Sequence, residues 1–231
     1  MSLRSGCQAY WSFDDDTVTD ISGNGNDLTN TGTTNTTGKL DDGRDLSGSG
    51  QYLTVPGNLF ENNTFSNWTK ALWFTTDNTG SEKTLLAAFE TSANRNFIIQ
   101  KLSSDKIFAV MYNTALGAYL SCVSTTTLST GTFYHVAVTY DGTTLRLYID
   151  GSEEASDATS SGTLNTNSVT EYIGRLDSSI TAQDWDGKVD ECGVWNRALG
   201  SSEVSDLYNS GNGFNPFTAA TINVFDIGAE F

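Results

Sequence analysis

The sequence predicts an all-β fold in which two antiparallel sheets pack face to face as a sandwich. Turn-forming residues are abundant, with 22 glycines among 231 residues, and long helical periodicity is nearly absent. The clearest strand signal is residues 133–151, FYHVAVTYDGTTLRLYIDG, where apolar residues alternate on both sides of a turn at Asp141 and Gly142. One face of this hairpin is too apolar to meet water, so we expect a second sheet to cover it.

The segments before this hairpin predict short strands separated by polar turns. Residues 9–14 form the first strand, with Ala9, Trp11 and Phe13 directed to the core. Residues 29–38 are a loop or a weak edge strand. Further strands are expected at 52–55, which Pro56 ends, and at 65–76, 84–91, 95–102, 106–113 and 119–125.

The segments after the hairpin complete the sandwich. Residues 152–168 are a long polar loop or a short edge hairpin, and residues 171–176 are a strand. In the closing run 185–211, simple alternation places Val189, Glu191 and Gly193 on one face.

One short helix is expected near residues 200–209. Leu199 and Val204 have the spacing of a hydrophobic staple around an N-cap at Gly200, and Glu203 takes the capping-box position. The whole chain then forms a single domain of residues 1–231. Its core covers about 9–212, and a C-terminal extension, 213–231, either adds an edge strand or lies across the sandwich.

The net charge of the chain limits the kinds of partner that it can bind. The net charge is −16 and the pI is about 4.1, so the chain repels the phosphates of nucleic acids and anionic membrane surfaces. The same charge favours divalent cations, although solubility alone also accounts for an acidic surface. No apolar run is long enough to cross a bilayer, and residues 1–10 lack the apolar region of a secretory signal. Three cysteines allow one disulfide, but their spacing does not select a pair.

Residues 20–28, DISGNGNDL, form a turn-rich loop with many oxygen donors. The side chains of Asp20, Asn24, Asn26 and Asp27 are the hard ligands that calcium prefers. The alternative is a turn of Asx and Gly residues that only reverses the chain.

Four stretches together resemble the laminin-G-like jelly-roll domains of the concanavalin A-like lectin/glucanase superfamily. In order they are YWSFDDDTVTDISGNGNDL, FSNWTKALWF, the hairpin quoted above, and WDGKVDECGVWNRALGSSEVSDLY. The resemblance covers about residues 9–212 and implies a jelly roll of two antiparallel sheets. It also implies a structural calcium ion held by Asp20, Asn24, Asn26 and Asp190, which would join the beginning of the domain to its end.

The superfamily includes glycoside hydrolases, but we expect no catalytic site here. A retaining glucanase needs two carboxyl groups on one strand face, whereas Glu153 and Glu154 are adjacent and point to opposite faces. His135, the only histidine, lies inside a predicted strand and is interpreted as structural.

The remaining function is binding. The resemblance implies a non-catalytic module for a glycan, within an extracellular, cell-surface or phage protein; the alternative is a structural or protein-interaction module that binds no sugar. Trp11, Trp73, Trp185 and Trp195 are assigned to the core. The candidate ligand contacts are Tyr112, Asn113, Tyr119, Asp177 and Asp184, although a solvated loop is the favoured interpretation of each.

Overall fold

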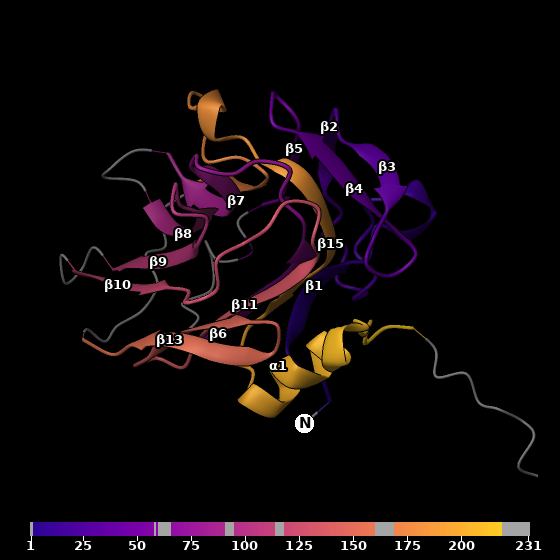
Figure 1. Ribbon diagram of the computed structural model, residues 1–231. Coiled ribbons are helices and arrows are strands. Elements are labelled where there is room, and N and C mark those ends of the chain that lie inside the picture. The colour runs from indigo at the N-terminus through magenta and orange to yellow at the C-terminus, as the bar shows by residue number, and fades with distance from the viewer. Residues whose placement is uncertain are drawn as a thin grey trace, which may run out of the picture.

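The computed structural model describes residues 2–57, 59, 66–90, 95–113, 118–159 and 169–218, apart from the side chains at 113 and 118. Its strands form two antiparallel sheets packed as a sandwich, with one short α-helix outside them (Figure 1). The predicted fold class is therefore confirmed.

Sheet A has eight strands in the described part of the chain, in the order β13-β12-β11-β6-β15-β4-β3, with β1 paired to β15. Its strands are β1 (Cys7–Trp11), β3 (Thr34–Thr37), β4 (Asp42–Ser47), β6 (Trp68–Phe74), β11 (Tyr134–Tyr140), β12 (Leu145–Ile149), β13 (Ser152–Asp157) and β15 (Asp186–Trp195).

Sheet B has seven strands among the described residues, in the order β10-β9-β8-β7-β14-β5-β2. Its strands are β2 (Thr29–Thr31), β5 (Tyr52–Thr54), β7 (Lys83–Phe89), β8 (Arg95–Lys101), β9 (Ile107–Asn113), β10 (Ala118–Val123) and β14 (Glu171–Ile173). The polar segment 29–38 contributes the edge strands β2 and β3, which confirms the edge-strand alternative. In the segment 152–168, residues 152–157 form the edge strand β13, and residues 160–168, which would complete the predicted edge hairpin, lie outside the described residues.

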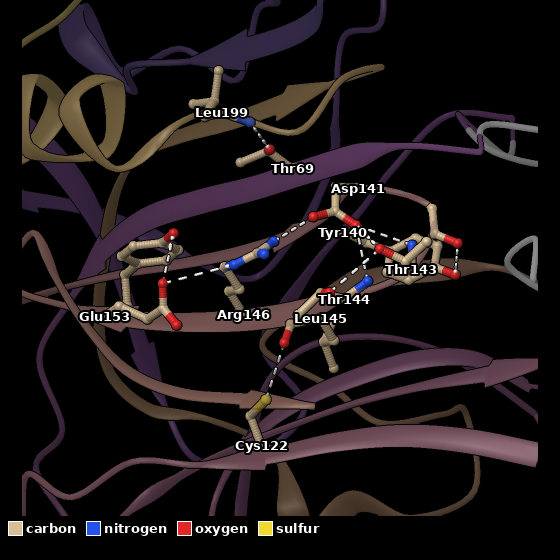
Figure 2. Close-up of polar contacts among 12 residues, drawn as sticks. Thr69, Cys122, Tyr140, Asp141, Thr143, Thr144, Leu145, Arg146, Glu153 and Leu199 are labelled. Carbon is tan, nitrogen blue, oxygen red and sulfur yellow. Dashed lines mark hydrogen bonds and ion pairs between the residues drawn. The ribbon is translucent and has the colours of Figure 1, made fainter. Parts of the chain in front are cut away.

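The predicted hairpin is formed by β11 and β12, with Tyr140 opposite Leu145. Asp141 closes its turn because Oδ1 accepts hydrogen bonds from the backbone N–H groups of Thr143 and Thr144, at 3.0 and 2.9 Å. Oδ2 accepts a third bond, of 2.5 Å, from Arg146 Nη1 (Figure 2). Burial acts to raise the pKa of Asp141, but these donors outweigh it and hold the pKa well below its usual range.

The main core lies between the two sheets. The alternating apolar residues of β11 and β12 face it, and so do Trp11, Trp68 and Trp185. A second apolar cluster covers the opposite side of sheet A, where Trp195 and Tyr148 pack against helix α1 (Ser201–Tyr208). Figure 1 shows α1 below β6, β11 and β13, on the side away from β7–β10. The four tryptophans predicted to be structural are all buried.

The first strand is shorter than predicted. It ends at Trp11 because Phe13 has a left-handed backbone, with φ of 63°, and a 3₁₀ turn follows at Asp14–Asp16. Strand β4 was not predicted, since its sequence DGRDLS is polar; its buried Arg44 side chain donates to Asp16 Oδ1 at 2.6 Å. Two further 3₁₀ turns lie at Thr181–Gln183 and Asn209–Gly211.

The predicted alternation in the closing strand is wrong. A bulge between Asp190 and Gly193 interrupts the pairing of β15 with β6, and Glu191 adopts φ of 48°. The extra residue shifts the pattern, so that Val189, Cys192 and Val194 all face the main core. Alternation alone had placed Val189 on the same face as Glu191.

Helix α1 confirms the predicted capping residues. Glu203 Oε2 accepts the backbone N–H of Gly200 at 3.0 Å, and Asn209 ends the helix with φ of 50°. Leu199 and Val204 are both buried in the cluster beneath it. Of the C-terminal extension, Phe217 packs beside Tyr10, with ring centroids 5.4 Å apart. The predicted contribution of residues 219–231 lies outside the described residues.

Candidate functional site

The outward side of sheet B carries a group of aromatic residues. Strand alternation explains their placement, because neighbours such as Leu53, Met111 and Ile173 face the core. We call this group the aromatic face; its members are Tyr52, Phe89, Phe108, Tyr112, Tyr119 and Tyr172. All but Tyr119 are half-buried, and the side chain of Tyr119 is 61% exposed. The face differs from the outward side of sheet A, part of which is covered by α1, Leu3 and Phe217.

Two of the predicted ligand contacts are brought together on this face. Tyr112 in β9 and Tyr119 in β10 are directly opposite in the strand register, and their ring centroids are 6.4 Å apart. The guanidinium of Arg95 lies 4.0 Å from the centroid of the Tyr112 ring. Asn113 is in β9, but its side chain lies outside the described residues.

A pocket of about 120 Å³ lies on the aromatic face at strands β7 and β14. We call it the Phe89–Tyr172 pocket after its two aromatic walls, which come from β7 and β14. Its other lining residues are Glu90, Val169, Thr170, Asp177 and Ser178. Tyr172 also contacts Tyr52, with ring centroids 5.4 Å apart. Of these residues, only Asp177 was a candidate from the sequence, because the aromatic walls come together only when it is known which strands are neighbours.

The two acidic residues predicted as ligand contacts are engaged with their own protein. Asp177 Oδ1 accepts the backbone N–H groups of Ser179 and Ile180, at 2.5 and 2.9 Å. Asp184 is fully buried and forms a two-bond ion pair with Arg175, at 3.1 and 2.9 Å, while Gly50 N donates to it at 2.8 Å. Asp184 therefore holds the 175–184 loop in place, and only Asp177 reaches the pocket.

The loop of the predicted calcium site is joined to β1 by hydrogen bonds. The Asp20 carboxylate accepts three backbone N–H groups, from Tyr10, Ser22 and Asn26, at 2.9 to 3.0 Å. The side-chain amides of Asn24 and Asn26 both donate to Gln8 O, at 3.2 and 2.7 Å. The structure thus brings Asp20, Asn24 and Asn26 together, with the amide oxygens of both asparagines left to accept.

Asp190 serves a different turn. Its Oδ2 accepts the backbone N–H groups of Lys39 and Leu40, at 2.7 and 3.0 Å, and its Oδ1 accepts that of Glu191 at 2.8 Å. None of these donors belongs to residues 20–28. The four predicted calcium ligands therefore do not form one site. Asp20, Asn24 and Asn26 share one loop, whereas Asp190 holds the turn between β3 and β4.

Asp190 also lies beside an acidic cavity that the sequence analysis missed. The cavity has a volume of about 250 Å³, and Asp14, Asp41 and Glu191 are among its lining residues. Burial raises the pKa values of Asp190 and Glu191 to about 8 each, and the nearby Asp14 carboxylate adds to both shifts. Among the described residues, no group of three or more His, Cys, Asp or Glu side chains is arranged to hold a metal ion.

The residues weighed for catalysis have other partners. Glu153 contacts Tyr148 Oη at 3.3 Å, whereas Glu154 accepts the backbone N–H groups of Thr125 and Thr126. His135 is buried in β11 beside the rings of Trp73 and Tyr208, with centroids 5.3 and 6.4 Å away, and those two rings stack on each other at 5.6 Å. The three cysteines are buried free thiols.

Comparisons with known proteins agree with this fold. Residues 47–205 match the Laminin_G_3 family of the concanavalin A-like lectin/glucanases superfamily. The first of the four resembling stretches, at 10–28, lies outside the matched part. A comparison with curated proteins finds no match.

Several solved structures share the fold at low sequence identity. The binding domain of Paraclostridial Mosquitocidal Protein 1 has a TM-score of 0.75 and 19% identity; the match covers 90% of this chain and 53% of that one. Domain 4 of AbnA, a GH43 extracellular arabinanase from Geobacillus stearothermophilus solved in complex with arabinotriose, has a TM-score of 0.71 and 18% identity, covering 87% and 97%. The receptor binding domain of botulinum neurotoxin D has a TM-score of 0.70 and 16% identity, covering 91% and 54%.

The chain thus spans about half the length of the toxin domains and nearly all of the arabinanase domain. These neighbours share its jelly-roll sandwich. In the described part of the chain, no helix is both long enough and apolar enough to span a membrane.

Proposed function

The chain belongs to the concanavalin A-like lectin/glucanase superfamily, and we propose that it is a non-catalytic module that binds carbohydrate through the aromatic face of sheet B. The observation that carries this proposal is the placement of six aromatic residues on one outward sheet side, in a sandwich whose other outward side is partly covered by α1. Aromatic rings stack on the apolar faces of sugar rings, and half-exposed tyrosines add a hydroxyl that can hydrogen-bond.

Two kinds of neighbour support a binding role. The arabinanase domain was solved with arabinotriose, and the toxin domains are described as binding or receptor-binding domains. We extend this role to the present chain and propose that it works outside the cell, as one module of an extracellular, cell-surface or phage protein. The catalytic candidates give no support for hydrolysis, because Glu153 and Glu154 serve different partners.

A glycan array that includes arabino-oligosaccharides tests the proposal. We expect the wild-type chain to bind at least one oligosaccharide, and Tyr119→Ala to weaken that binding about tenfold, as the loss of one stacked ring would. Phe214→Ala is the matched control, since Phe214 is an exposed aromatic residue beside the acidic cavity and far from the aromatic face in sequence. If Tyr119→Ala leaves glycan binding unchanged, the binding site is not on the aromatic face. If the wild-type chain binds no glycan on a broad array, the proposed carbohydrate-binding function is wrong.

One observation favours the second candidate, a protein-interaction module. Tyr119 and Val123 are both exposed on β10, the edge strand of sheet B. Capture of a protein partner that Val123→Asp abolishes, together with an array that stays silent, would select this alternative.

We also propose that the module holds a structural calcium ion at three of the four residues that the sequence indicated, Asp20, Asn24 and Asn26. Asp190 is left out because its carboxylate accepts the backbone N–H groups of the turn between β3 and β4 and of Glu191. What supports the proposal is the convergence of the three residues in one loop with free amide oxygens. The hydrogen bonds of these residues join the loop to β1, and a bound ion would stabilise the same junction.

Thermal melting with calcium and with a chelator checks this proposal. The chelator should lower the melting temperature of the wild-type chain, and Asp20→Asn should lose that difference. The Asp20→Asn substitution itself destabilises the protein, because the wild-type carboxylate accepts three backbone N–H groups. The quantity to compare is therefore the calcium-dependent difference in melting temperature within each protein. Equal wild-type melting under both conditions, with no metal found by elemental analysis, would rule the ion out.

A further inference from the structure

We propose that the ion pair between Arg175 and Asp184 positions one wall of the carbohydrate site. The Arg175 guanidinium fixes the ring of Tyr52, and Tyr52 in turn fixes the ring of Tyr172 at the Phe89–Tyr172 pocket. Tyr172 contacts the sugar, whereas Arg175 and Asp184 are positioning residues that act through it. This inference rests on the proposed carbohydrate function and adds two residues that control the affinity without touching the ligand.

The 175–184 loop is closed at its base. The backbone N–H of Trp185 donates to the carbonyl oxygen of Gly174 at 2.8 Å, which holds together the residues on either side of the loop. Next to this bond, the first and last loop residues form the ion pair, in which Nε and Nη2 of Arg175 donate to the two carboxylate oxygens of Asp184. The side chains are 8% and 0% exposed. A buried, two-bond pair leaves the planar guanidinium little freedom to move.

The guanidinium transmits this fixed position to the aromatic face. Its central carbon lies 3.9 Å from the centroid of the Tyr52 ring, within the range of a cation–π contact. The rings of Tyr52 and Tyr172 meet edge to face, with centroids 5.4 Å apart and an angle of 89° between their planes. Tyr172 is one wall of the pocket. Three successive contacts therefore connect the buried Asp184 carboxylate to a ring that faces the ligand.

The residues that follow Arg175 belong to the same wall. Leu176 is buried in an apolar cluster on the outward side of sheet B, whose other buried members are Ala87, Ile98 and Val110. Asp177 and Ser178 line the pocket. Because the ion pair and Leu176 both hold this end of the loop, the pocket wall is formed before the ligand arrives. A preformed wall loses less conformational entropy on binding than a wall that the ligand must order.

The test begins with the affinity for the oligosaccharide that the wild-type chain binds most tightly on the array, measured by titration calorimetry well below the melting temperature. Arg175→Lys keeps a positive charge beside Asp184 but removes the planar group that lies over Tyr52. We expect it to weaken binding about fivefold. Arg197→Lys is the matched control, because Arg197 forms a two-bond pair with Glu203 at α1, on the outward side of sheet A. It should keep the affinity within about twofold.

Double variants identify the ring through which the ion pair acts. In the Arg175→Lys background, Tyr172→Ala should cost much less affinity than it costs in the wild-type chain, because the ring that it removes is no longer held in place. Tyr119→Ala should cost about tenfold in both backgrounds, because Tyr119 lies in β10 and has other neighbours. A general weakening of the fold would instead affect both tyrosines alike. Asp184→Asn should repeat this pattern, and Arg175→Lys decides the question by itself if the unpaired guanidinium prevents Asp184→Asn from folding.

The outcomes separate the ion pair from the function as a whole. Additive losses for Arg175→Lys and Tyr172→Ala would overturn the positioning role and leave carbohydrate binding by the aromatic face intact. An Arg175→Lys variant that binds as tightly as the wild-type chain would do the same. A folded wild-type chain that binds no glycan would overturn the proposed function, and this inference with it.

Discussion

Buried acidic side chains in this protein are held by donors of the same chain. Asp20 and Asp190 each accept three backbone N–H groups, and Asp184 pairs with Arg175. A carboxylate that leaves water must be satisfied in this way, because an unpaired buried charge costs several kcal/mol. The sequence shows the residue type and its loop, but it does not show which donors surround it. Ligand candidates chosen by type alone therefore include residues that close turns, as Asp184 does.

His135 makes a prediction about acid stability. Burial beside Trp73 and Tyr208 lowers its pKa from 6.5 to about 3, and its Nδ1 has no hydrogen-bond partner among the described residues. Below pH 6.5 the unfolded chain binds a proton that the folded chain refuses, so stability falls as the pH drops toward 3. We expect this one residue to cost the wild-type chain about 2 kcal/mol between pH 7.5 and pH 5.

Urea unfolding of wild type and of His135→Phe at those two pH values checks the prediction. The variant keeps an aromatic ring beside Trp73 and Tyr208 and removes the titrating group. Its stability should fall by about 2 kcal/mol less than that of wild type, since all other titrating groups are shared. Equal losses in the two proteins would show that His135 titrates normally in the folded state.

At the scale of single elements, sequence patterns predicted the features that depend only on residues close together in the chain. The capping residues of α1, the turn at Asp141 and the alternation of β11 and β12 all follow from neighbours in the sequence. The bulge in β15 does not, because it depends on Glu191, whose carboxylate accepts a hydrogen bond from Tyr10 Oη in β1. Strand β4 was missed for the same reason: its buried Arg44 pairs with Asp16, a partner 28 positions away that the sequence does not show.

Helix α1 gives a prediction at this scale. Glu203 accepts the N–H of Gly200 and two bonds from Arg197, both of 2.8 Å. Glu203→Ala should destabilise the fold by about 1 kcal/mol, because a helix cap and a partly exposed ion pair are lost together. Asp206→Ala removes a carboxylate from the same helix and should leave the stability nearly unchanged. Thermal or urea unfolding of both variants compares them; similar losses would mean that the cap contributes nothing specific.

At the scale of the whole molecule, the two sheets are joined by a buried ion pair as well as by apolar packing. Lys70 in β6 of sheet A donates to Glu171 in β14 of sheet B, and both side chains are almost fully buried. The Lys70 ammonium also lies 4.3 Å from the centroid of the Phe97 ring. Burial lowers the pKa of Lys70, while the Glu171 carboxylate opposes that change. The pair links segments that are 101 residues apart in the sequence.

Because of this ion pair, we expect substitutions of Lys70 and Glu171 to have strongly non-additive effects on the free energy of unfolding. Glu171→Leu alone should cost about 3–5 kcal/mol, because it leaves the Lys70 ammonium buried without its carboxylate. Adding Lys70→Met should recover most of that loss, since an apolar pair of similar size needs no charge partner. Urea unfolding of the two single variants and the double variant measures the coupling. Additive losses would mean that the two charges do not depend on each other.

The sequence by itself determined the all-β class, the turns, the one helix and the residue types available for binding, because these depend on alternation and capping over a few residues. Only the tertiary structure decided which strands are neighbours, and so which residues share a surface. Tyr112 and Tyr119 could be proposed from the sequence, but Phe89 and Tyr172 could not, because 83 positions separate them and only sheet B brings them to one pocket. Contacts between distant segments follow from the packing of whole sheets, and that packing minimises the exposure of both apolar faces at once.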